Sequence, residues 1–253
     1  MRDVITNIAR APRIFFAKQR VVRELKPLLI DIQQYQPADY EKIIPVLRDI
    51  EQQLLAVPPN KAGMRWIHQQ DTVYFYGERD FALPYDDFIQ KVDITHAGKF
   101  YRDSVSTDTK VVLTDPQARA VHQVVRIVAL PQPNYAAFMG KGDLDVYKLE
   151  KIDYSDDEQK VWMYTVFSPN GSALCDDGYL SFKKIAGGAG TRVAFLACQN
   201  FPVPPVMALL QLDKWHWLKK QLTEHAYQVF CNQMFNNIKD CYAGIRFDVG
   251  RDA

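Results

Sequence analysis

The last two-thirds of the chain alternates short apolar segments with turns and ends in one long amphipathic segment. Thr72 to Tyr76 is a dense run of β-branched and aromatic residues, which favours a strand. The turns that follow, such as Ser168 to Gly171, are short and join antiparallel neighbours. The pattern therefore predicts a β-meander, whose further strands lie near residues 109–114, 120–130, 143–154, 159–168, 178–185 and 190–200.

Helical patterns lie on both sides of this meander. Pro84 begins a short helix that runs through Val92, and residues 95–107 are expected to be helix or loop. The final helix is predicted from about Pro204 to Tyr242, where roughly 35 residues would span about 50 Å, enough to cross a sheet. Its apolar positions recur at spacings of three and four: Leu218, Leu222, Ala226, Val229, Phe230, Met234, Ile238 and Cys241.

Residues 1–30 carry seven basic and two acidic side chains, interleaved with apolar residues. Pro12 and Pro27 bracket the part that reads as a basic amphipathic helix. Three interpretations stay open for it. The helix docks on its own domain with a solvated basic face, it rests on an anionic membrane surface, or it is an Arg-rich targeting peptide.

Two further helices are expected in residues 37–56, one after Pro37 and one opened by Pro45. A Pro-Pro-Asn turn at residues 58–60 then gives the best boundary in the chain. We expect residues 1–65 to form an N-terminal helical extension and residues 66–253 to form the main domain. The apolar residues that should share one face of the second helix are Val46, Leu47, Ile50, Leu54 and Leu55.

Composition narrows the function classes. The net charge of +1 gives no electrostatic argument for nucleic acid as a partner. The chain has no uninterrupted apolar run of about 18 residues and no apolar signal core, so a cytoplasmic protein is expected. The histidines show no metal-ligand spacing, so we expect neither a metal nor a cofactor. The four cysteines lack CxxC spacing and are expected to be free thiols: Cys175, Cys198, Cys231 and Cys241.

Three segments carry a resemblance to a known superfamily: Asp177 to Phe182, Gly190 to Val193, and Asn200 to Pro205 leading into the final helix. With the strand and short helix before the meander, they resemble the START-like helix-grip (SRPBCC) superfamily. This group includes lipid-transfer domains, the birch-pollen-allergen fold, polyketide cyclases and coenzyme-Q-binding proteins. The resemblance covers about residues 71–242.

The resemblance implies an α+β helix-grip fold, with a curved antiparallel sheet of about seven strands wrapped on the long C-terminal helix. It also implies a cavity between sheet and helix that binds or transports a hydrophobic small molecule or lipid. It implies no reaction. One alternative is a cyclase or hydratase that uses cavity tyrosines, Tyr147 or Tyr164, as acid–base groups. Another is an interaction protein whose cavity is filled.

Several strands are apolar on both faces, as in residues 161–167, so we expect both faces to be covered and the N-terminal helices to pack on one. Alternation directs Phe182, Phe195 and Gln199 inward. His122 and Arg126 share a face, where Arg126 holds a carboxylate or phosphate head group or else faces solvent. The predicted ligand-binding residues are Arg126, Tyr147, Trp162, Tyr164, Phe182, Phe195, Met207 and Leu210.

Overall fold

The computed structural model describes residues 35–69, 72–95, 100, 104–129, 144–200 and 216–245. The predicted basic helix in residues 1–30, the start of the predicted closing helix, and Met207 and Leu210 lie outside this part of the chain. The described elements are α2 (Pro37–Glu41), α3 (Ile44–Ala56), β1 (Arg65–Gln69), β2 (Thr72–Phe81), α4 (Tyr85–Lys91), β3 (Ser104–Asp115), β4 (Ala120–Ala129), β5 (Leu144–Tyr154), β6 (Glu158–Phe167), β7 (Cys175–Ile185), β8 (Gly190–Asn200) and α7 (His216–Tyr242).

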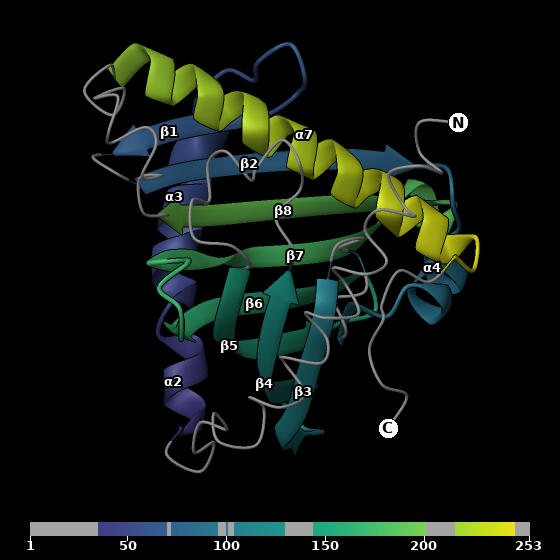
Figure 1. Cartoon of the computed structure of the whole chain (residues 1–253). Coiled ribbons are helices and arrows are strands. Elements are labelled where there is room, and N and C mark those ends of the chain that lie inside the picture. Colours follow the sequence, from purple (N-terminus) through teal and green to yellow (C-terminus); the bar gives the residue numbers. More distant parts are fainter. Residues whose placement is uncertain are drawn as a thin grey trace.

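The strands form one antiparallel sheet in the order β1-β2-β8-β7-β6-β5-β4-β3. In Figure 1, α7 runs along β1, β2 and β8, while β3, β4 and β5 stand at a steep angle to them because the sheet twists and curves. A meander from β3 to β8, closed by a C-terminal helix, is the helix-grip arrangement. The predicted fold class is therefore confirmed.

Two strands depart from the prediction. The sheet has eight strands in place of about seven because β1 pairs with β2 as an edge strand. Its sequence, Arg-Trp-Ile-His-Gln, is mostly polar and only partly buried, so its strand pattern is weak. β3 begins at Ser104, inside the stretch expected to be helix or loop, and its polar first half pairs with β4 all the same.

The face of the sheet that carries α7, called here the helix face, holds the larger apolar core. Side chains of α7 pack there on residues that alternate along β2, β7 and β8. Phe75 stacks on Tyr227 with ring centroids 4.8 Å apart, and Phe195 lies 5.4 Å from Phe235. Phe88 of α4 meets Phe182 edge to face at 5.1 Å. This end of the helix face is therefore filled by aromatic rings.

The opposite face, called here the outer face, is covered by α2 and α3. Leu47 and Leu54 of α3 are fully buried, and Tyr179 donates a hydrogen bond to Glu51. The prediction that N-terminal helices pack on the sheet is confirmed for α2 and α3. Val46 and Leu55, however, are exposed, so the buried stripe of α3 is narrower than predicted. The outer-face core comprises Ile44, Leu47, Leu54, Tyr76, Trp162, Tyr179, Ala194 and Leu196.

Candidate functional site

A buried ion pair lies on the helix face, beyond the aromatic core. Lys148 of β5 and Asp176 of β7 share the parity of Ile152 and Leu180, which belong to that core. The Lys148 Nζ lies 2.6 Å from Oδ2 of Asp176 and donates to its backbone carbonyl at 2.7 Å. The two side chains are only 5% and 14% exposed, respectively. A buried ion pair of this kind has no net charge, and removal of one partner lowers stability because the other charge is left buried without compensation.

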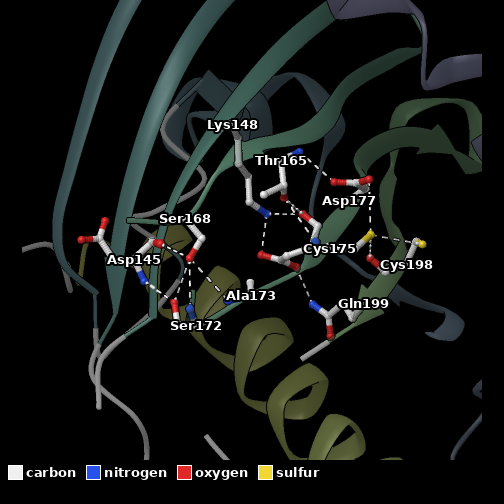
Figure 2. A network of polar contacts seen from close by, with 11 residues as sticks. Asp145, Lys148, Thr165, Ser168, Ser172, Ala173, Cys175, Asp177, Cys198 and Gln199 are labelled. Carbon is white, nitrogen blue, oxygen red and sulfur yellow. Dashed lines mark hydrogen bonds and ion pairs between the residues drawn. The ribbon is translucent and has the colours of Figure 1, made fainter. Parts of the chain in front are cut away.

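Two neighbouring side chains complete the surroundings of Asp176. Thr165 Oγ1 donates to the Asp176 carbonyl at 2.9 Å, and Gln199 Nε2 donates to its Oδ1 at 2.6 Å. Figure 2 shows Lys148, Thr165 and Gln199 converging from three strands. The carboxylate fixes the amide orientation because only Nε2 can donate to it. Oε1 of Gln199 is consequently a buried acceptor that has no hydrogen-bond partner among the described residues.

A second polar pair lies on the same face. Gln123 of β4 donates to Glu150 of β5 at 2.7 Å and to the carbonyl of Thr95 at 2.8 Å. Both side chains are buried. The six helix-face residues with these contacts form what we call the polar band: Gln123, Lys148, Glu150, Thr165, Asp176 and Gln199.

Apolar side chains flank the polar band on both sides. One flank is the aromatic core under α7. The other is a separate buried cluster of Val125, Ile127, Val146 and Ala173. A surface that is apolar, then polar, then apolar suits a small molecule with an apolar body and few hydrogen-bonding groups. Within the described ranges, no group of three or more His, Cys, Asp or Glu side chains could hold a metal ion.

Two predicted site residues lie on the helix face as expected. Phe182 and Phe195 are both buried in the aromatic core, and their inward direction is confirmed. An added Cβ at Gly77 would come within 2.8 Å of the Phe195 ring, so the ring already contacts the β2 backbone closely. Their predicted contact with a ligand stays a prediction. For Met207 and Leu210, the same prediction falls outside the described residues.

The other four predicted residues lie on the outer face, away from α7. Arg126 is buried, yet it neither faces solvent nor points to the helix face. It donates from Nε and Nη2 to the carboxylate of Asp145 at 2.9 and 2.7 Å, and its guanidinium lies over the Tyr147 ring. Trp162 packs in the core under α3, and Lys42 of the α2–α3 turn lies 4.4 Å from the Tyr164 ring centroid.

The reason for this placement is geometric. Alternation sorts strand residues into two sets but does not say which set faces α7 when both sets are apolar. A register shift near Tyr147 and Phe167 also brings those two rings together at 6.0 Å. The polar band was missed, although the inward parity of Gln199 was a usable signal. Lys148 and Asp176 come together only through the pairing of β5, β6 and β7.

Directly behind the polar band, the outer face carries a second polar group at the start of β7. Asp177 Oδ1 accepts a hydrogen bond from the backbone N–H of Thr165 at 2.7 Å. Burial raises the pKa of the Asp177 carboxyl. Cys175 Sγ lies 3.3 Å from Oδ2 of Asp177 and 3.5 Å from Sγ of Cys198 (Figure 2). The hydrogen bond with Cys198, together with burial and the Asp177 charge, raises the pKa of the Cys175 thiol.

Comparison with known proteins gives structural similarity only. No protein-family model matches the chain, and no curated protein matches its sequence. Among solved structures, the chain is similar to human StAR-related lipid transfer protein 5 (9% identity, 81% of this chain and 98% of that one, TM-score 0.45). It is also similar to the lipid transfer and protein localization domain of human StarD13 (12%, 79% and 96%, TM-score 0.44). A third is the Zhui aromatase/cyclase from Streptomyces sp. R1128 (10%, 66% and 94%, TM-score 0.40).

Proposed function

We propose that the protein binds or transports a hydrophobic small molecule or lipid between the helix face of the sheet and α7. The observation that carries the proposal is the polar band. It is buried in an otherwise apolar face, and it presents the Gln199 Oε1 acceptor with no partner among the described residues. Such an acceptor costs free energy unless a donor reaches it. A ligand hydroxyl or amine would supply that donor.

The packing supports one position for the apolar body of the proposed ligand. The aromatic core under α7 is filled by rings at contact distance, such as Phe88 against Phe182. The cluster around Val125, Ile127 and Val146, next to the polar band, is the alternative flank. Burial of ligand surface there would contribute roughly 25 cal/mol per Å², and the polar band would orient the molecule.

The geometry does not favour the cyclase or hydratase alternative. Tyr147 and Tyr164, the tyrosines of the cyclase or hydratase hypothesis, lie on the outer face. Tyr164 packs there with Tyr40 of α2, and the Tyr147 ring lies under the guanidinium of Arg126. They do not converge with the polar band. The filled-cavity hypothesis predicts no ligand at all, so the binding experiment below separates it from the proposal.

The test uses native mass spectrometry of freshly purified protein, organic extraction, and titration with N-phenyl-1-naphthylamine, a neutral apolar dye with one N–H donor. We expect a co-purifying apolar molecule and saturable dye binding. Gln199→Leu should weaken the dye by about 2- to 12-fold, the worth of one hydrogen bond. Asn200→Leu, the neighbour on the outer face, is the matched control and should bind as wild type. Absence of any ligand and of dye binding would refute the function, whereas equal binding by all three proteins would refute the location.

Membrane contact through residues 1–30 is a further part of the proposal. Seven basic residues interleaved with apolar ones suit an anionic surface during loading or release. No helix in the described ranges is long and apolar enough to span a membrane. Sedimentation with vesicles of phosphatidylcholine and phosphatidylserine tests this contact. Equal binding by the full chain and a chain lacking residues 1–30 would contradict it.

A further inference from the structure

Two cysteines lie side by side on the outer face, at the end of the β7–β8 pair. Cys175 is the first residue of β7, and Cys198 of β8 pairs in register with Asp177. Their side chains are therefore diagonal neighbours, and the two sulfur atoms lie 3.5 Å apart. Both residues are only partly buried, so a small reagent can reach them. The other two cysteines, Cys231 and Cys241, belong to α7.

We propose that Cys175 and Cys198 form a reversible intramolecular disulfide that affects the polar band, which lies on the opposite face of the same strands. The sulfur atoms need to approach by about 1.5 Å to reach a bond length of about 2.05 Å. No other side chain has to leave, because the two thiols already contact each other. This inference goes beyond ligand binding, and formation of the disulfide does not depend on the proposed function.

The oxidant is a small-molecule disulfide such as glutathione disulfide. The Cys198 thiolate attacks one sulfur of the oxidant, whose S–S bond breaks and releases one thiolate. Cys175 gives up its proton, for which the Asp177 carboxylate 3.3 Å away can serve as the base, and its sulfur attacks Sγ of Cys198 in the mixed disulfide. The second glutathione leaves. Two protein thiols lose two electrons, and the oxidant becomes two thiols that take up both protons.

A chain of contacts links this pair to the polar band. Oxidation removes the S–H donor that Cys175 offers to Asp177. The same carboxylate accepts the backbone N–H of Thr165, whose hydroxyl bonds the carbonyl of Asp176. Asp176 also pairs in register with Gln199 on the helix face. A bond between Cys175 and Cys198 therefore constrains the two strands that position Asp176 and Oε1 of Gln199.

The test is peptide mapping of the full chain after equilibration in glutathione redox buffers and alkylation of the remaining thiols. Trypsin places Cys175 in the peptide 161–183 and Cys198 in the peptide 193–214. We expect these two peptides to be linked in most of the oxidised wild-type protein and separate after reduction with dithiothreitol. Cys175→Ser and Cys198→Ser should each abolish the link, while Cys241→Ser, the matched control on α7, should retain it.

Two results would overturn the inference. One is the absence of the linked peptide when glutathione disulfide has reacted with either cysteine, as shown by a persistent mixed disulfide. The other is a link formed only between two protein molecules. Coupling to the polar band is measured separately, as a change in the dissociation constant for N-phenyl-1-naphthylamine on oxidation of wild type that Cys198→Ser does not show. A protein that binds no dye but forms the link refutes the proposed function and leaves the disulfide standing.

Discussion

The Arg126–Asp145 pair allows a direct test of how burial changes the effect of an ion pair on the free energy of unfolding. Asp80 and Arg192 on β2 and β8 have the same bidentate geometry, with bonds of 2.7 and 2.9 Å. The two pairs differ in exposure, which is 2% and 11% for Arg126 and Asp145 against 38% and 50% for Arg192 and Asp80. Hydrogen bonding from Arg192 lowers the pKa of Asp80. Asp80, like Asp145, is therefore a carboxylate that interacts with one arginine.

Asp145→Ala leaves the Arg126 guanidinium buried without its carboxylate, which should lower the free energy of unfolding by about 3–5 kcal/mol. Asp80→Ala lets Arg192 turn to water and should cost about 0–1 kcal/mol. For a domain of ordinary stability, about 5–15 kcal/mol, the loss from Asp145→Ala is about a fifth or more of the total.

Urea unfolding followed by tryptophan fluorescence and circular dichroism gives both values. The double variant Arg126→Met with Asp145→Leu removes both charges and should recover most of the loss, because breaking a buried pair costs more than replacing it. An equal cost for Asp145→Ala and Asp80→Ala would refute this explanation, as would a double variant less stable than Asp145→Ala. Retained dye binding by the double variant would also show that Arg126 holds the fold together and no ligand.

Two other predictions concern stability. Gly178→Ala would place a Cβ 2.0 Å from the backbone carbonyl oxygen of Leu196, so thermal unfolding should show a loss of about 3 kcal/mol or more, the upper end for overpacking. Gly171→Ala, in open space at φ +62°, should cost only about 1–2 kcal/mol, and equal losses for the two variants would contradict the clash. Burial raises the pKa of Tyr85 to about 12, above the value of 10 in the unfolded chain. The contribution of the neutral Tyr85 hydroxyl to folding stability is therefore complete below pH 10 and is lost as the pH rises through 12. Tyr85→Phe should leave the stability at pH 7 unchanged or slightly higher, since the Tyr85 hydroxyl has no partner among the described residues. Between pH 9 and 11, urea titrations should show that this variant loses less stability than wild type. Parallel pH profiles for the two proteins would contradict this.

Local sequence patterns were enough to predict most of the fold. Alternation in β7 and β8 was enough to assign Phe182, Phe195 and Gln199 to the face that meets α7, because polar residues such as Arg192 mark the other set. The proline in the first turn of α3 and the short turns of the meander located elements for similar local reasons.

The site depended on pairings that no local pattern contains. Trp162 lies between Val161 and Met163, and the strand around Tyr147 has charged residues on both faces. Either strand could therefore be turned either way until the helices on each side were known. The ion pair of Lys148 with Asp176 joins residues 28 positions apart through an intervening strand. Lys148 and Asp176 lie in strands with an amphipathic pattern, and nothing in that pattern indicates that the two side chains form a buried ion pair.

The docking of α3 changes how the chain can be divided. A fragment beginning at residue 66 would keep every strand except the start of β1, yet it would leave the rings of Trp162 and Tyr179 uncovered and the carboxylate partner of Tyr179 missing. Exposed aromatic surface of that extent favours self-association. Any shortened chain should therefore start before Pro37, since α2 and α3 cover the outer face of the sheet.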